Sequence, residues 1–175
     1  MKDDTIFEIR QDPNIEYFQD HMPGNNCFGC GRENHDGLKI SSYWEGDESV
    51  CIWRSQERYQ GWKGILHGGI LASIIDCHTM CTAMAAVYKL EGRNLDSEPI
   101  YRYATGTLTV KYLRPTPNDL PIELRARIKQ IKGKKVVIQC RAYSEGELTA
   151  EADVIAIRVF DSSKDNEGVF AADER

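Results

Sequence analysis

The sequence has no excess of positive charge, and this bears first on its partners. Its 22 Lys and Arg residues are outnumbered by 27 Asp and Glu residues, so the formal net charge is -5. Because phosphate contacts need a basic surface, this balance argues against a nucleic-acid-binding protein. With 175 residues, of which 41% are hydrophobic and 28% charged, the chain is typical of one globular domain with a proper core, with or without tails.

The sequence also has few features of a membrane protein. Charged residues interrupt the long apolar runs before about 20 residues are reached, so we expect no membrane span. The acidic segment 1–18 lacks the apolar core of a signal peptide. We therefore expect a cytoplasmic protein, without internal repeats or low-complexity regions.

Disulfide bonds are not expected either, although the chain has six cysteines. Cys77, Cys81 and Cys140 lie in apolar segments, which favours buried free thiols. Cys27 and Cys30 form a single C-x-x-C pair in the glycine-rich stretch CFGCGRENHDGL. That spacing is half of a zinc site, and a second C-x-x-C is absent. A structural loop is therefore favoured over a zinc site, and we expect no metal and no cofactor.

Hydrophobic periodicity predicts an α+β fold. We expect a short helix around 14–21, loops at 54–64 and 90–103, and a long helix from near His67 to about Lys89. The expected strands span residues 38–44, 48–53, 105–113, 121–131, 134–143 and 147–160, with tight turns at EGD, KGKK and SEGE. The long helix is apolar nearly all round, so a curved antiparallel sheet should wrap around it. The expected organisation is an N-terminal arm (1–26), one domain (27–160) and a polar C-terminal tail (161–175).

One carboxylate, Asp76, stands in the middle of this apolar helix. No Lys or Arg occurs between Gly64 and Met84, and burying a lone carboxylate is costly. Asp76 therefore either reaches a surface or is used by the protein. At the helix start, Gly68 and Gly69 let another group approach the free N–H donors, where the helix dipole favours negative charge. These glycines form either an oxyanion hole for acyl transfer or a close packing contact.

Helical geometry separates these features. His67 and Asp76 lie on opposite sides of the helix, about 13 Å apart along its axis, so they cannot form a His–Asp dyad. The Gly68 N–H and the Asp76 carboxylate are about 12 Å apart, too far to act on one carbonyl. A two-fold dimer with antiparallel helices would bring them together. For His67 we favour a positioning role in the loop. His78 does not share the face of Asp76 and is expected to be a packed or interface histidine.

Three segments carry a resemblance to a known family. GILHGGILASIID and TGTLTVKYLRPTP resemble the hotdog-fold acyl-CoA thioesterases of the phenylacetyl-CoA thioesterase (PaaI-like) type. CFGCGRENHDGL resembles the N-terminal loop of the branch that includes the thioesterase superfamily member 4 type. The resemblance spans residues 27–160. It implies the hotdog fold, with a long central helix wrapped by a curved antiparallel sheet, and hydrolysis of an acyl-CoA thioester to free acid and CoA.

The resemblance also implies roles for single residues. Asp76 matches the catalytic carboxylate, acting as general base or as nucleophile. Gly68 matches the glycine whose N–H polarises the thioester carbonyl. Thr105, ten residues before Pro115, stands where the family often has a Ser or Thr that assists the water. Gly61 stands where the family frequently has a polar residue.

Substrate binding and assembly complete the expectations. Gly69 is expected to bind substrate, and of the basic residues in the second half Arg114, with Lys111, is the best candidate for the CoA phosphates. The alternative is that these basic residues form an ordinary row of surface charges without a ligand. We expect a homodimer, or a homotetramer formed by two dimers. The competing interpretations are a non-catalytic acyl-CoA-binding or regulatory hotdog protein and a structural dimer with a zinc-stapled loop.

Overall fold

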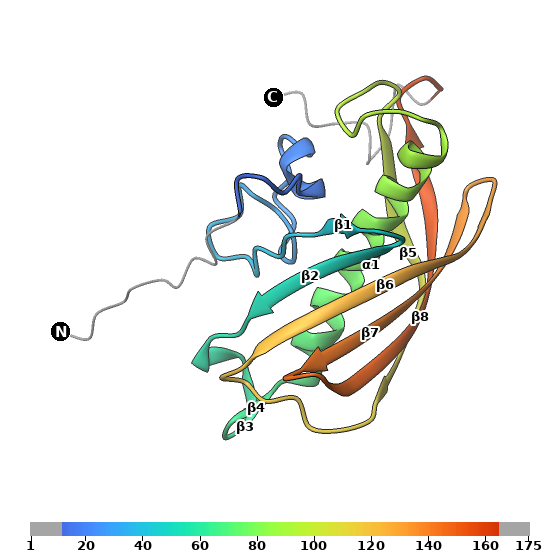
Figure 1. Ribbon diagram of the computed structural model, residues 1–175. Coiled ribbons are helices and arrows are strands. Elements are labelled where there is room, and N and C mark those ends of the chain that lie inside the picture. The colour runs from blue at the N-terminus through green and yellow to red at the C-terminus, as the bar shows by residue number, and fades with distance from the viewer. Residues whose placement is uncertain (1–11, 165–175) are drawn as a thin grey trace.

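One long helix lies across the concave side of a curved antiparallel sheet (Figure 1). The computed structural model describes residues 12–164. The helix is α1 (Gly68–Leu90). The large sheet contains β1 (Tyr43–Glu45), β2 (Glu48–Arg54), β5 (Tyr101–Tyr112), β6 (Pro121–Lys132), β7 (Lys135–Ser144) and β8 (Glu147–Asp161). The smaller elements are two 3-10 turns, η1 (Phe18–His21) and η2 (Glu57–Tyr59), and a hairpin of β3 (Gln60–Trp62) and β4 (Ile65–Leu66).

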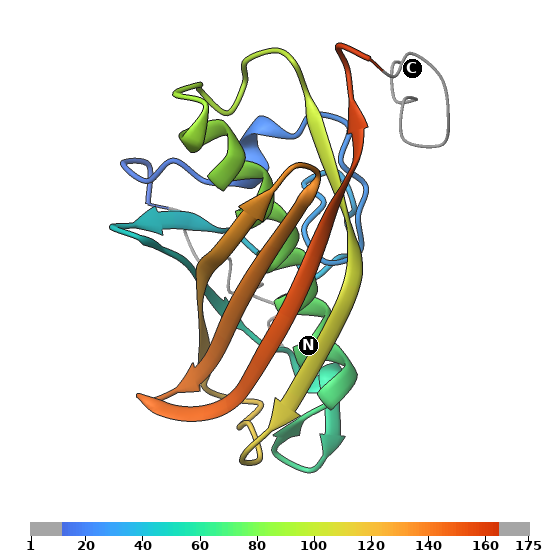
Figure 2. The same cartoon turned by 90° about the vertical axis from the view of Figure 1, so that its right-hand side faces the viewer.

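The large sheet has the strand order β1-β2-β6-β7-β8-β5, and all its pairings are antiparallel. The three expected tight turns are confirmed between consecutive paired strands. In the β7–β8 turn, Glu145 (φ 50°) and Gly146 (φ 80°) both have positive φ, as a type I′ hairpin turn requires. Figure 2 shows β5 at the edge of the sheet beside β8. Among residues 12–164, the order therefore leaves β5, the strand that follows the helix, without a second neighbour in the sheet.

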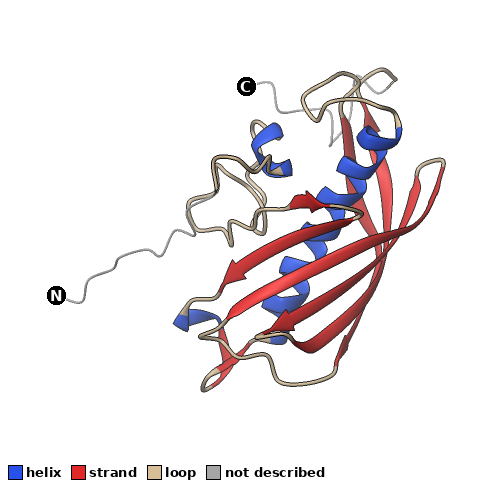
Figure 3. Cartoon of the chain, viewed as in Figure 1, coloured by secondary structure: helices blue, strands red, loops and turns tan. Residues whose placement is uncertain are grey.

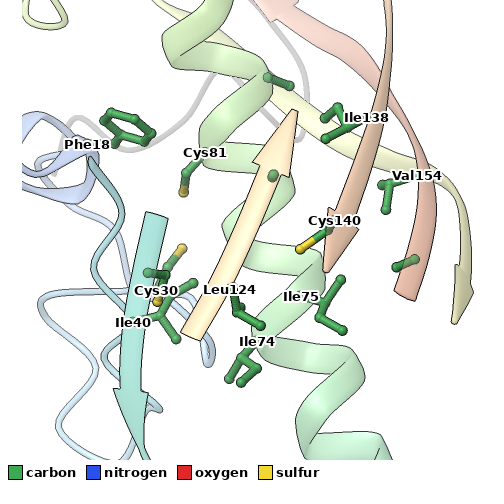
Figure 4. Packing of buried hydrophobic residues seen from close by; sticks show 14 of the residues in the cluster. Phe18, Cys30, Ile40, Ile74, Ile75, Cys81, Leu124, Ile138, Cys140 and Val154 are labelled. Carbon is green, nitrogen blue, oxygen red and sulfur yellow. The ribbon is translucent and has the colours of Figure 1, made fainter. Parts of the chain in front are cut away.

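The helix is buried on two sides, which explains why its apolar residues occupy most of its circumference. On one side Ile74 and Ile75 pack in the same buried cluster as residues of the sheet (Figure 4). On the other side the N-terminal segment, mostly loop in Figure 3, covers α1 with Phe18 and Cys30. The expected wrapped-helix architecture is confirmed.

By length and composition, α1 could also cross a membrane. Its mean hydropathy reaches 1.6, and 67% of that 18-residue window is buried inside the fold. Apart from Asp76, no charged residue occurs between Gly68 and Tyr88, so charges do not interrupt this run as the sequence argument assumed. Its burial between the sheet and the N-terminal segment is that of a core helix.

The first expected strand is shorter than its pattern suggests. Residues 38–42 instead bond to the N-terminal segment: Leu38 N donates to Phe28 O (2.7 Å) and Ile40 N donates to Gly29 O (3.1 Å). Only Tyr43–Glu45 pairs with β2. The alternation of apolar and polar residues could not show whether this segment pairs with β2 or with the N-terminal segment. Leu38 and Ile40 are buried here, as they would be in a strand paired with β2.

Three other boundaries differ from expectation. The loop expected at 54–64 contains η2 and β3, because Gln60–Trp62 pairs with β4. The loop expected at 90–103 ends earlier, because Tyr101 pairs with Asp161 and starts β5. That pairing also places Asp161 in β8 rather than in the tail. Residues 1–11 of the arm and 165–175 of the tail lie outside the described residues.

Candidate active site

The carboxylate of Asp76 is half-buried on the side of α1 that faces β5. Thr105 Oγ1 donates a hydrogen bond to Asp76 Oδ1 at 2.5 Å. Among residues 12–164, no Lys, Arg or His forms an ion pair with Asp76. Thr105 itself is exposed. Asp76 therefore reaches the surface beside the edge strand, held by one hydroxyl and not neutralised by a cation.

A β-bulge in β5 turns Thr105 toward the helix. Leu108 and Val110 pack against the core, and strict alternation would put residue 106 rather than 105 on that face. The register shifts between Thr105 and Thr107, so Gly106 is an additional residue. A Cβ at Gly106 would come within 2.9 Å of Ile157 Cγ1, so a side chain does not fit there. The sequence analysis missed this bulge, although a glycine inside a strand pattern is its usual signal.

The start of α1 is capped by His67. Its Nδ1 accepts a hydrogen bond from Gly69 N (2.9 Å), and its carbonyl accepts from Ile70 N (3.0 Å) and Leu71 N (3.1 Å). Within the described part of the chain, Gly68 is the one first-turn amide for which no acceptor is found. The Gly68 N–H is therefore the donor left available at the helix start, and His67 holds the neighbouring amides through hydrogen bonds.

Gly69, which the sequence predicts to bind substrate, takes part in the cap. Its amide donates to His67, and a Cβ at Gly69 would lie 3.0 Å from His67 Cε1. Gly61 lies against the same histidine, since its Cβ would be 3.3 Å from His67 Cα. The neighbouring Gln60 does not supply the polar group missing at Gly61, because its Oε1 accepts from Gly64 N (2.6 Å) within the hairpin.

An open groove of about 320 Å³ adjoins the helix start. It is lined by Ile65, Leu66, Gly68, Leu71, Tyr112, Leu113, Arg114, Pro115 and Thr116. Tyr112, which the sequence analysis did not single out, donates its hydroxyl to Gly68 O (2.7 Å) and ties the end of β5 to α1. Its place on the inward face follows from the alternation through Leu108 and Val110.

The two basic candidates differ in position. Arg114 lies on the rim of the groove and forms an exposed ion pair with Glu147. Lys111 does not line the groove, because it precedes Tyr112 and successive strand residues point to opposite faces. Of the two, the structure thus places only Arg114 beside the helix start.

The structure of one chain keeps Gly68 and Asp76 apart. Both belong to α1, eight residues from each other, which corresponds to about 12 Å along the axis. His67 and Asp76 are likewise not brought together. Within one chain, therefore, the Asp76–Thr105 pair and the Gly68 amide lie at two separate places along α1.

His78 is fully buried, as expected of a packed histidine. Its Nδ1 lies 2.9 Å from Ser42 Oγ and its Nε2 lies 3.4 Å from Ser49 Oγ. Burial lowers the pKa of His78 to about 4, so the imidazole is neutral at physiological pH. These bonds connect α1 to β2 and to the N-terminal segment, and they keep His78 away from the groove.

The cysteines are arranged differently from the sequence interpretation. All six are free, but the Sγ atoms of Cys27, Cys30 and Cys77 lie within 4.8 Å of one another. The expectation of a metal-free loop relied on the absence of a second cysteine pair near the C-x-x-C. The fold supplies partners from α1, so that reason does not hold.

A long helix with a glycine amide at its start, wrapped by an antiparallel sheet, defines a hotdog-type domain. The chain belongs to the thioesterase superfamily, whose family model matches residues 63–151. The matched region begins just after β3 and includes β4, the whole of α1, and the strands from β5 into β8. Gly68, Asp76 and Thr105 all fall within it.

Known relatives extend the match. The chain is 29% identical to the acyl-coenzyme A thioesterase THEM4 of Xenopus laevis over 112 residues, covering 63% of this chain and 45% of the relative. It is 26% identical to THEM4 of Bos taurus over 146 residues, covering 81% of this chain and 54% of the relative. The chain therefore spans about half the length of the curated relatives it matches.

Solved structures show the same fold. A thioesterase superfamily protein from Shewanella loihica PV-4 is 28% identical with a TM-score of 0.58, covering 69% of this chain and 91% of that one. The smu.793 protein from Streptococcus mutans, solved bound to acetyl CoA, is 10% identical with a TM-score of 0.56, covering 70% of this chain and 90% of that one. The expected hotdog fold is confirmed.

Proposed function

We propose that this protein hydrolyses acyl-CoA thioesters to free acid and CoA, with Asp76 as general base or nucleophile. The observation that carries the proposal is the Asp76 carboxylate, half-buried, hydrogen-bonded to Thr105 and without an ion pair among residues 12–164. A carboxylate in this state is ready to accept a proton or to attack a carbonyl carbon. The THEM4 relatives named as acyl-CoA thioesterases, and the S. mutans neighbour bound to acetyl CoA, support this substrate class.

In the general-base route, Asp76 takes a proton from a water molecule that attacks the thioester carbonyl carbon. The carbonyl oxygen becomes an oxyanion and accepts the Gly68 N–H. The C–S bond then breaks, and the CoA thiolate leaves and receives the proton. In the nucleophilic route, Asp76 Oδ forms a mixed anhydride, which water hydrolyses after the thiolate has left. In both routes the Thr105 hydroxyl holds the carboxylate in place.

We also propose that the active unit is a homodimer. The separation of about 12 Å between Gly68 and Asp76 requires that one of them come from a second chain. The edge strand β5 carries Thr105 and exposes Gly106 and Thr107 beside it, and an unpaired edge is available for pairing with another copy. A two-fold axis there would give two equivalent sites. A tetramer would be a pair of such dimers.

The groove beside Gly68 suits one arm of the substrate. Its lining is mostly apolar, so it can receive an acyl chain or the pantetheine arm. Arg114 at its rim can reach a CoA phosphate, because an exposed Arg–Glu pair holds its partners only weakly. We place the protein in the cytoplasm, a reducing compartment in which its six free thiols are stable.

Asp76→Asn tests the mechanism. The amide keeps the size of the side chain and removes its charge and basicity. Loss of a general base should lower kcat by roughly 10²–10⁴-fold, and loss of a nucleophile by more. The matched control is Asp153→Asn, an exposed carboxylate on β8, which should keep full activity. The assay is thiol release from a panel of acyl-CoA esters, alongside melting temperature.

The outcomes separate the hypotheses. The proposal expects Asp76→Asn to lose hydrolysis while its melting temperature holds or rises and acyl-CoA binding persists. A wild-type protein that binds acyl-CoA esters without turnover would be a non-catalytic binding protein. If Asp76→Asn keeps hydrolysis within a few-fold of wild type, the mechanism is wrong.

A further inference from the structure

Cysteines from two distant segments meet where the N-terminal loop crosses α1. Cys27 and Cys30 belong to the loop and Cys77 belongs to the helix, yet their three Sγ atoms lie within 4.8 Å of one another. The Sγ atoms of Cys27 and Cys77 are 3.5 Å apart. Three potential soft ligands therefore converge on one point outside the proposed active site.

Cys81 adds a fourth thiol. It follows Cys77 by four residues on α1, so both project from the same side of the helix. The neighbouring Cys30 thiol is the first cause of its raised pKa, and the Cys81 Sγ also donates to Met22 Sδ (4.0 Å). In Figure 4, Cys81 leaves α1 on the side where Cys30 lies. The cluster thus combines a C-x2-C pair from a loop with a C-x3-C pair from a helix.

We propose that Cys27, Cys30, Cys77 and Cys81 bind one zinc ion, which ties the N-terminal loop to α1. Four thiolates are a typical ligand set of structural zinc, and both spacings fall within those of known zinc sites. A tetrahedron with Zn–S bonds of about 2.3 Å places its sulfur atoms about 3.8 Å apart. Among Cys27, Cys30 and Cys77, the observed separations, from 3.5 Å to at most 4.8 Å, surround that value; Cys81 is not part of this group of three. An iron–sulfur cluster with two irons would need wider separations.

The loop is shaped to present its two cysteines. Gly31 N donates to Cys27 O (2.9 Å), which closes a tight turn around the C-x2-C pair. A Cβ at Gly31 would come within 2.5 Å of Cys27 N, so only glycine fits in this turn. At Gly29 a Cβ would lie 2.3 Å from Cys77 Sγ, so glycine also lets the loop reach the helix.

The side chain of Asn25 hydrogen-bonds with both cysteines of the loop. Its Oδ1 accepts from Cys27 N (3.0 Å), and its Nδ2 donates to Cys30 Sγ (3.5 Å). Such N–H donors stabilise the negative charge of metal-bound thiolates. Hydrogen bonds from Cys27 first, then from Cys77 and Cys81, hold the pKa of the Cys30 thiol below its usual value. Zinc binding would release the protons of the thiols that bind it.

A zinc ion at this cluster would also affect the position of Asp76. Cys77 directly follows Asp76, so an ion bound there would fix the helical turn that carries the carboxylate. The zinc would be structural, since four protein ligands leave no position for water or substrate. This proposal replaces our sequence-based expectation of a metal-free loop.

Elemental analysis of the full chain tests the proposal. Protein produced with zinc in the medium, and purified without added metal or chelator, should contain about one zinc per chain. Cys77→Ser and Cys81→Ser should lose this zinc. Cys140→Ala removes a buried thiol on β7, outside the cluster, and should keep it. After removal of zinc by a strong chelator, the wild-type melting temperature should fall, and Zn²⁺ but not Mg²⁺ should restore it.

Cobalt identifies the ligands independently of these variants. Co²⁺ added to the chelated wild-type protein should give the intense visible absorption of tetrahedral thiolate coordination. Zinc-free protein whose cluster thiols all react with a thiol reagent would overturn the proposal. So would a non-reduced mass lower by two hydrogen atoms, which would indicate a disulfide, or a protein-bound iron–sulfur chromophore.

Discussion

At the scale of single residues, the state of Asp76 depends on a hydroxyl that sequence alternation would have turned away. Thr105 contacts Asp76 because Gly106 adds one residue to β5 and shifts the inward face. A β-bulge of this kind re-aims a side chain without disturbing the rest of the ladder. The glycine and the threonine therefore act together in orienting the carboxylate.

Thr105→Val tests this contact, since it keeps the shape and removes the hydroxyl. A hydrogen bond to a charged group is worth roughly 1.5–3 kcal/mol, so kcat should fall roughly 10- to 100-fold while KM changes little. Thr109→Val, also exposed on β5, is the matched control and should keep kcat. In the background of Asp76→Asn, adding Thr105→Val should lower kcat little further, because the Thr105 hydroxyl acts through the Asp76 carboxylate. Fully additive losses would show that Thr105 acts elsewhere.

His78 predicts a pH dependence of stability. The unfolded chain binds a proton near pH 6.5, whereas the buried imidazole does so only near pH 4. The free energy of unfolding therefore has its full value, as far as His78 is concerned, above pH 6.5. It decreases as the pH falls toward 4, by up to roughly 3 kcal/mol. Urea unfolding of wild type between pH 7 and 4.5 should show this loss.

His78→Gln is the comparison for that experiment. It should be less stable at pH 7, because it disturbs the bonds to Ser42 and Ser49. Its stability should fall less steeply than that of wild type from pH 6.5 downward. Parallel curves for the two proteins would mean that His78 does not carry the effect.

At the scale of elements, each side of α1 contacts a different neighbour through a different polar or thiol group. Asp76 faces the edge strand β5, His78 faces β2, and Cys77 with Cys81 faces the N-terminal loop. The helix start is a further site, where His67 caps the other first-turn amides and leaves the Gly68 N–H available. This start can be altered without altering the rest of the helix.

Gly68→Pro should remove the oxyanion donor and leave the helix intact. Proline suits the first helical position, and the residue before it must be extended, as His67 is (φ -63°, ψ 128°). A Cβ there would make an ordinary contact of 3.4 Å with Tyr112. We expect kcat to fall roughly 10²–10³-fold with an unchanged circular dichroism spectrum. An unfolded variant, or full activity, would contradict this assignment.

At the scale of the whole molecule, the shared site that we propose would make activity a property of the assembly. If Gly68 of one chain meets Asp76 of another, a heterodimer of Gly68→Pro and Asp76→Asn contains one intact site and one doubly altered site. Random 1:1 association gives roughly half heterodimers, each with one working site of two, or about a quarter of wild-type activity.

Co-expression of the two variants, followed by light scattering and a thioesterase assay, measures this recovery. The expected mass is that of two chains or of a multiple of two. Separately purified variants, mixed without exchange, are the control and should stay inactive. No recovery in verified heterodimers, or a folded and active monomer, would refute the shared site.

The sequence by itself determined the elements and the candidate chemistry. Period-2 alternation predicted the strands, and an apolar circumference predicted a helix enclosed by a sheet. The spacing of Gly68 and Asp76 along one helix determined that they lie apart within one chain, since helical rise is a local property. The lone carboxylate and the glycine-bearing helix start were visible without any tertiary contact.

Only the tertiary structure decided which segments meet. The contact of Thr105 with Asp76 depends on a bulge in strand pairing, and the approach of Cys77 and Cys81 to the C-x-x-C loop joins residues about 50 positions apart in the chain. Local periodicity carries no information on such contacts, because they arise from how the buried surfaces of whole elements pack. For the same reason, the pattern at 38–42 could not show that these residues bond to the N-terminal loop rather than extend β1.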